Sequence, residues 1–191
     1  MWKMLYFWKN EPNFKIKNYS ILFMKKILAS GAILLIIISF SACEKDDICV
    51  DGDTPLLVIG FYDVNDTATV KKVTKLRVGG VDQEFTVSTV ADRTDLDLIQ
   101  IPLQINSPAT SYVFISNSAT NSSNEETGNA DVVTFNYETR EVFVSRACGF
   151  IANFDNLTGS LATDSDNWIK GIEIVQTTIN DQATAHVKIF H

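Results

Sequence analysis

Histidine and cysteine are scarce in this chain, which has two of the former and three of the latter in 191 residues. A zinc site needs three or four ligands, mostly from these two residue types, and we expect the cysteines in other roles. A Ser-His-Asp relay needs a histidine beside a nucleophile held on a sharp turn, and no such turn motif is present. His186 falls in a predicted strand, where we expect a solvated side chain. These shortages argue against zinc and serine-hydrolase chemistry.

Basic residues are scarce after position 43. Six of the 16 Lys and Arg residues precede Cys43, but only one of the 23 Asp and Glu residues does. The remainder of the chain therefore has 10 basic and 22 acidic residues, a net charge of −12. Binding to nucleic acid depends on Lys and Arg displacing counterions from phosphates, so we expect no nucleic-acid partner.

No apolar run is long enough to cross a bilayer. The longest, residues 27–40, has 14 uncharged residues. As a helix it would reach about 21 Å, short of the roughly 30 Å hydrocarbon core. Because Lys25 and Lys26 precede it and small residues follow it, the run resembles the hydrophobic region of a signal peptide. A buried core helix is the alternative.

A cysteine follows this run directly. The residues "FSAC" (40–43) resemble the lipobox of bacterial lipoproteins, which implies that Cys43 is acylated, for example with palmitate, and becomes the mature N-terminus. Several acyl chains together give durable membrane anchoring, whereas one is marginal. The next residues, "EKDD" (44–47), resemble the tag that sends Bacteroidota lipoproteins to the outer face of the outer membrane; a solvated tether is the alternative. We expect a lipid-anchored outer-membrane protein, periplasmic or surface-exposed.

These features predict the organisation of the chain. Residues 1–23 are expected to be a mis-called N-terminal extension, with translation starting at Met24. A lipoprotein signal peptide is predicted over 24–42, a tether over 43–53 and a β-sandwich domain over 54–191.

The two cysteines that remain form an even pair, Cys49 and Cys148. Exported proteins meet an oxidising compartment, so we predict a disulfide from the tether to a late strand. Its loop of about 100 residues would contribute on the order of 4 kcal/mol. Two buried free thiols are the alternative.

Short apolar segments with turn signals fill the rest of the chain. Residues 56–63 are apolar on both faces, as in a central strand, and 98–105 alternate with period two, with Pro102 indicating an edge. Residues 132–138 and 141–147 predict a hairpin closed at Thr139 and Arg140. Further strands are predicted at 69–78, 84–90, 111–116, 149–154, 170–179 and 183–190. Eight or nine strands predict an antiparallel β-sandwich, with a closed β-barrel as the alternative; the polar segment 117–130 is expected to be disordered.

Acidic residues offer weak candidates for metal binding or hydrolysis. Two clusters have the oxygen ligands that calcium prefers: Asp63 and Asp66 with Asn65, and Asp164 and Asp166 with Asn167. Neither has the rest of a calcium-loop motif, so acidic turns are the favoured interpretation and no metal or cofactor is expected. Asp95 and Asp97 could serve as a glycosidase pair, but solvent-facing residues of a strand have the same spacing.

Two surface features are candidates for ligand binding. Lys71, Lys75 and Arg77 would share one strand face with Val73 and form a basic stripe on an acidic protein, although lysines also protect strand edges. Trp168 could stack on a sugar, although a partly buried corner residue is commoner.

Finally, "RACGFIANF" (146–154) and "WIKGIEIVQTTINDQATAHVKIFH" (168–191) resemble a family of flavobacterial lipoproteins of unknown function. The resemblance covers nearly all of the chain from Cys43 and implies a β fold, but it assigns no catalytic residue. We expect a non-enzymatic binding or structural module of the cell envelope, with a protein or glycan partner. The alternative is a carboxylate-dependent glycan hydrolase, with or without calcium.

Overall fold

The computed structural model describes residues 23–31, 49 and 52–191. The chain divides into two units, Met1–Asp46 and Asp47–His191. In the first unit, residues 23–31 form an exposed helix that includes Lys25, Lys26 and the start of the apolar run. No helix in the described part of the chain is both long enough and apolar enough to cross a membrane. Cys43 and the rest of the predicted signal peptide lie outside the described residues.

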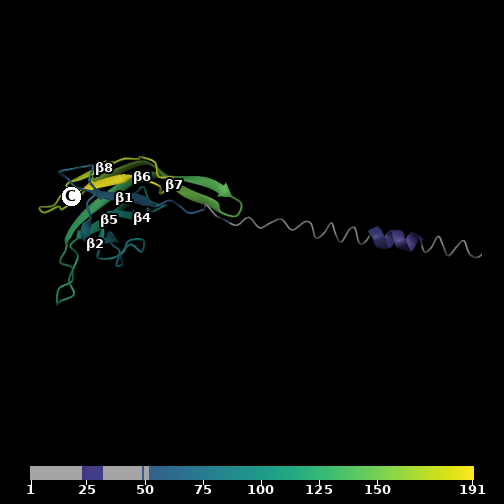
Figure 1. Ribbon diagram of the computed structural model, residues 1–191, viewed down its shortest axis with the longest axis horizontal. Helices are drawn as coiled ribbons and strands as arrows, with labels where there is room; N and C mark the ends of the chain where they lie inside the picture. Colours follow the sequence, from purple (N-terminus) through teal and green to yellow (C-terminus); the bar gives the residue numbers. More distant parts are fainter. Residues whose placement is uncertain (1–22, 32–48, 50–51) are drawn as a thin grey trace, which may run out of the picture. The chain divides into compact units, whose positions relative to one another are not determined.

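The second unit is a sandwich of two β-sheets, as predicted (Figure 1). Its described residues form nine strands: β1 Leu57–Tyr62, β2 Val73–Gly80, β3 Thr94–Leu96, β4 Leu98–Ile101, β5 Ala109–Ser116, β6 Asn129–Ser145, β7 Gly149–Leu161, β8 Gly171–Ile174 and β9 Val187–Phe190. One sheet has the order β4-β1-β9-β8 and the other β3-β2-β5-β6-β7. Within the described residues both sheets are open, so the barrel alternative is wrong.

One strand pair departs from the expected antiparallel arrangement. β1 and β9 are parallel, with Ile59 opposite Val187 and Phe61 opposite Ile189. A parallel pair needs a long crossover between its strands. Here the crossover is nearly the whole domain, because the second sheet is built between these two strands in the sequence. Alternation of apolar residues does not distinguish strand directions, which is why the sequence did not indicate this pair.

The core lies between the two sheets. β1 is buried on both faces from Leu57 to Phe61, as its unbroken apolar run predicted. In the other sheet every second residue of β5 is buried, as expected for a strand with one face in the core. The largest fully buried side chains are Phe61, Phe114, Phe135 and Phe154. Full burial of each of these side chains stabilises the folded state by about 1.5–3 kcal/mol.

The hairpin predicted at Thr139 and Arg140 is wrong. β6 continues through both residues, which pair with Phe154 and Asn153 of β7. The chain turns instead between Ser145 and Gly149. Gly149 has a φ of 71°, a conformation that glycine adopts without strain. The long β6–β7 hairpin extends beyond the other strands (Figure 1).

Two other predicted strands are shorter or missing. In residues 84–90 the only pairing is an isolated bridge between Thr86 and Gly79. β8 ends at Ile174 because the following chain leaves its sheet: Ile179 exchanges backbone hydrogen bonds of 2.7 and 3.1 Å with Phe154 of β7. The expected edge is confirmed, since β4 is an edge strand and ends directly before Pro102.

Candidate functional site

The predicted disulfide joins the start of the domain to the tip of the β6–β7 hairpin. Cys49 and Cys148 are 99 residues apart and are bonded, with 4.9 Å between their Cα atoms. Gly52 packs against the bridge so closely that a Cβ there would lie 2.2 Å from the Cys49 Sγ. The Ala152 N–H also donates to the Thr54 Oγ1 at 3.1 Å. The segment before β1 is therefore attached to the hairpin at two places.

In the first calcium candidate, the two carboxylates are hydrogen bonded within their own turn. The Asp63 carboxylate accepts the Asn65 N–H at 2.7 Å and forms an ion pair with Lys71 at 3.2 Å. The hydrogen bond from the Asn65 backbone, followed by that from Lys71, lowers the pKa of Asp63. The Asp66 carboxylate accepts hydrogen bonds from Ala68 and Thr69. These contacts match the acidic-turn interpretation.

The second calcium candidate is also a turn. The Asp164 carboxylate accepts the Asp166 N–H at 2.9 Å, and the Asn167 side chain accepts the Asp164 N–H at 3.0 Å. Among the described residues, no three His, Cys, Asp or Glu side chains gather as metal ligands would. Of the glycosidase pair, Asp95 accepts the Lys75 N–H at 2.8 Å. That bond places its carboxylate against a strand backbone.

The predicted basic stripe is wrong. Val73 is buried in the core, and Lys71 lies outside β2, where its Nζ donates to the His191 carbonyl at 2.9 Å. Lys75 has a φ of 44°, at an irregularity in the pairing of β2 with β3. This irregularity shifts the alternation, so that Leu76 faces the core and Arg77 faces outward. A single extra residue in a strand reverses which side chains share a face.

Arg77 belongs to a network of ion pairs on the outer face of the five-stranded sheet. Its guanidinium contacts Asp92 at 2.9 Å and Glu126 at 3.0 Å, and the hydrogen bond to Asp92 is the main cause that raises its pKa. Arg93 contacts the same Glu126 oxygen at 3.3 Å. Both guanidinium groups therefore have their charge balanced within the protein.

Glu126 is the centre of this network. Burial would raise its pKa, but hydrogen bonds from the Gly128 N–H, the Ser118 hydroxyl, the Ala119 N–H and Arg93 outweigh burial and lower the pKa to about 2. These bonds hold together the base of the polar loop between β5 and β6, and the contacts of Glu126 with Arg77 and Arg93 attach that base to the sheet. The segment expected to be disordered thus has a defined hairpin shape, with Thr120 bridged to Glu126.

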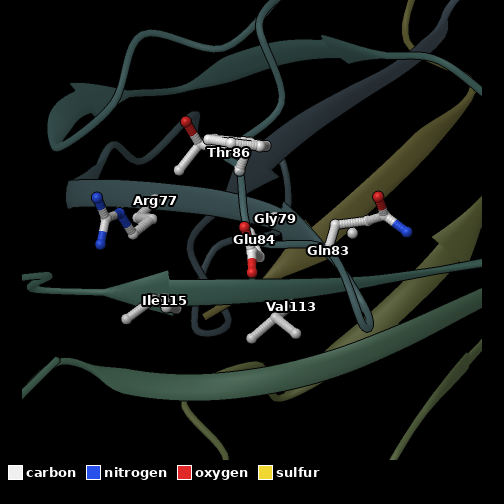
Figure 2. Close-up of a pocket in the computed structure, with 9 residues that line it drawn as sticks. Arg77, Gly79, Gln83, Glu84, Thr86, Val113 and Ile115 are labelled. Atoms are coloured by element: carbon white, nitrogen blue, oxygen red, sulfur yellow. The ribbon is translucent and has the colours of Figure 1, made fainter. Parts of the chain in front are cut away.

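An open cleft of about 370 Å³ lies beside this network, and we take it as the candidate binding site. Val113 and Ile115 of β5 line it, and Figure 2 shows Arg77 and Gln83 on opposite sides with Glu84 between them. Phe85, which also lines it, is 82% exposed. Phe85 thus adds an exposed apolar ring to a lining that already holds Val113 and Ile115, and a largely apolar lining with a few polar groups is typical of binding sites.

A second hollow of about 320 Å³ adjoins the same chain segment. It shares Gln83, Phe85 and Thr86 with the first and is lined by Leu103 and Tyr112. Burial raises the pKa of Tyr112 to about 12, and its hydroxyl donates to the Pro102 carbonyl. Phe85 thus stands between two hollows, on a segment that pairs with the edge of β2.

Trp168 does not offer a free face for a sugar. Its indole N–H donates to the Phe114 carbonyl at 3.1 Å, and its ring packs 6.4 Å from Phe61 and 5.6 Å from His191. It is therefore the partly buried corner residue that was the alternative.

The expectation of a solvated His186 is wrong. The side chain is fully buried, and its Nδ1 accepts the Val58 N–H at 3.0 Å. Acceptance at Nδ1 places the proton of the neutral ring on Nε2, which has no hydrogen-bond partner among the described residues. Burial lowers the pKa of His186, so the ring is neutral. The residue directly before β9 faces inward here because its backbone N–H also donates to the Val58 carbonyl of β1, at 2.9 Å.

Sequence reasoning missed the buried Asp131. Its Oδ2 accepts the Ile169 N–H at 2.8 Å and so holds the segment after Trp168 against β6. Burial is the main cause that raises its pKa. A signal was present, because Asp131 is in phase with Val133 and Phe135 on the core-facing side of β6. Phe85 and Glu126 were missed because both lie in loops, where the sequence pattern does not predict exposure or contacts.

Comparison with known proteins places most of this domain in one family. A family model described as "Family of unknown function (DUF6452)" matches residues 75–191, which is more than half of the chain. No curated protein and no solved structure matches the chain.

Proposed function

The chain belongs to the DUF6452 family, whose function is unknown, and from that premise we propose that it is a lipid-anchored envelope module that binds a partner without catalysing a reaction. The proposed location is the outer membrane of a Bacteroidota bacterium. The proposal has two parts, anchoring and binding, which are supported by different observations.

Anchoring rests on the leader sequence. Two lysines precede the 14-residue apolar run, and Cys43 follows it after two small residues. The net charge of −12 gives the domain no affinity for anionic lipids. Acylation would hold such a domain on a membrane. The flavobacterial source and the choice of outer-membrane face belong to this proposal and rest on the resemblance described for the sequence.

Binding rests on one observation, the exposed Phe85 at the mouth of an open cleft. The ring and the floor of Val113 and Ile115 offer apolar contact, and Gln83 and Glu84 offer polar contact. This mixture suits a glycan or an extended peptide. Arg77, which lines the cleft, is paired with Glu126 at 3.0 Å, so these two charges shape the cleft rather than act as proton donors or acceptors.

Metabolic labelling tests the anchor. A bacterial host that exports the full chain is grown with a clickable palmitate analogue. We expect label on the wild-type protein and none on the Cys43→Ala variant. Label on both proteins, or on neither, would contradict acylation at Cys43.

Photo-crosslinking tests the cleft. A benzophenone amino acid replaces Phe85 in the exported protein and, as a control, replaces Leu98, which is exposed at an edge of the other sheet. Benzophenone inserts into C–H bonds of peptides and sugars alike, so either partner would be captured. We expect a specific adduct at position 85 and none at 98. Equal adducts at both positions, or none at 85, would contradict a binding role for the cleft.

A further inference from the structure

The tip of the β6–β7 hairpin carries an exposed aromatic pair. Phe143 and Phe150 lie opposite each other in the pairing of the two strands, with ring centroids 5.3 Å apart at an interplanar angle of 63°. The two side chains are 56% and 67% exposed. Val142 and Ile151, their neighbours toward the domain, are only partly buried. The hairpin thus presents apolar surface at its tip, which extends beyond the other strands (Figure 1).

The anchored end of the chain is tied to this same tip. Cys148, in the turn of the hairpin, is bonded to Cys49, and Ala152 is hydrogen bonded to Thr54. Cys43 is only six residues before Cys49, and six residues reach at most about 20 Å. An acylated Cys43 would therefore keep the aromatic pair within reach of the membrane that holds its acyl chains.

Charge favours the same orientation. Residues 141–151 contain one acid, Glu141, and one base, Arg146, and are neutral as a group. The chain from Cys43 onward has a net charge of −12. An anionic lipid surface repels the acidic body, and the neutral, apolar tip is the part of the domain that approaches such a surface at least cost.

We propose that the tip of the β6–β7 hairpin docks on the lipid surface and places the Phe143 and Phe150 rings among the headgroups. This inference rests on the proposed acylation of Cys43 and extends it: the disulfide makes the lipid anchor and the hairpin one membrane-contacting end. The domain then contacts the membrane at two points, the acyl chains and the hairpin tip. Two contacts restrict its orientation more than a flexible tether would, and they fix the direction in which the cleft at Phe85 faces.

Depth-dependent fluorescence quenching tests the docking. The lipidated full-length protein with Phe150→Trp is reconstituted into vesicles of phosphatidylethanolamine and phosphatidylglycerol whose acyl chains are brominated near the headgroups. Phe85→Trp is the matched control, because it places the same ring at an exposed site away from the tip. The parent protein, whose described tryptophan is Trp168, supplies the background.

After subtraction of this background, we expect the emission of the Phe150→Trp variant to fall roughly by half and to shift to the blue, as for a ring about 5–10 Å below the surface. The emission of the Phe85→Trp variant should be unchanged. Anchored protein with equal quenching in both variants would overturn the docking and leave the acylation intact. Protein without a lipid on Cys43 by mass spectrometry would overturn both proposals. An unquenched indole at position 150 together with a crosslinked dimer would show that the tip binds a second copy of the chain, and it would also overturn the docking.

Discussion

Removal of the Cys49–Cys148 disulfide should destabilise the domain by an amount that follows from the length of its loop. The cysteines are 99 residues apart, and closing a loop of about 100 residues in the unfolded chain corresponds to about 4.7 kcal/mol in the chain-entropy model. The native protein without the bond recovers some freedom in the segment before Thr54 and in the hairpin turn. We therefore expect a net loss of about 3 kcal/mol, within the range usual for native disulfides.

Urea unfolding of the Cys49→Ser, Cys148→Ser double variant measures this loss. With a slope of about 2 kcal/mol/M, the midpoint should fall by about 1.5 M. Trp168 reports the transition, because it is the only tryptophan after Cys43 and packs on the core residue Phe61. Ala147→Ser, in the same turn but with the bond intact, is the control and should not shift the midpoint. A double variant that unfolds at the wild-type midpoint would refute the reasoning.

Three further predictions concern the core, the ion-pair network and the buried histidine. Phe135→Ala should cost about 3–5 kcal/mol because it leaves a cavity in the core, whereas Phe85→Ala should stay within about 0.5 kcal/mol because that ring is exposed; equal midpoints in urea would contradict this assignment. Glu126 has a pKa of about 2 in the folded protein against an ordinary value of 4.5, so its contribution to stability is complete above about pH 4.5 and is lost as the pH falls toward 2. Glu126→Gln should therefore cost about 1–2 kcal/mol at pH 7, allowing for partial exposure, and less at pH 3; an equal cost at both pH values in urea titrations would count against the network. His186 has a lowered pKa, so its ¹⁵N NMR shifts should indicate a neutral ring protonated on Nε2 at pH 6.5, and a doubly protonated ring there would disprove its burial.

Much of the fold could be predicted from local patterns. The unbroken apolar run of β1 indicated a strand buried on both faces, and the strand predicted over 132–138 is part of β6, where every second residue from Val133 to Tyr137 is buried. Both signals come from the direction of successive side chains along a strand, which is a local property. The pairing of Cys49 with Cys148 could also be predicted, because only two cysteines remained once Cys43 was assigned to a lipid.

The errors arise where a local pattern fits two structures equally well, or where burial depends on a distant segment. The face of Arg77 was misjudged because the irregularity at Lys75 breaks the alternation of β2, and such an irregularity has no reliable composition. His186 was expected at the surface because its burial comes from pairing with Val58, 128 residues away. The turn of the long hairpin was misplaced because a polar pair, Thr139 and Arg140, is as compatible with an extended strand as with a turn.

The sequence by itself determined the acidic charge of this protein, its β-sandwich class and the one pair of cysteines available for a disulfide if Cys43 carries a lipid, as proposed. Only the tertiary structure decided which strands are neighbours, that β1 and β9 run parallel, that Glu126 gathers two arginines, and that Phe143 and Phe150 stand exposed at the tip to which Cys49 is bonded. The reason is physical. Composition and periodicity depend on each residue and its near neighbours, whereas burial, ion pairing and exposure depend on which distant segments the fold brings together.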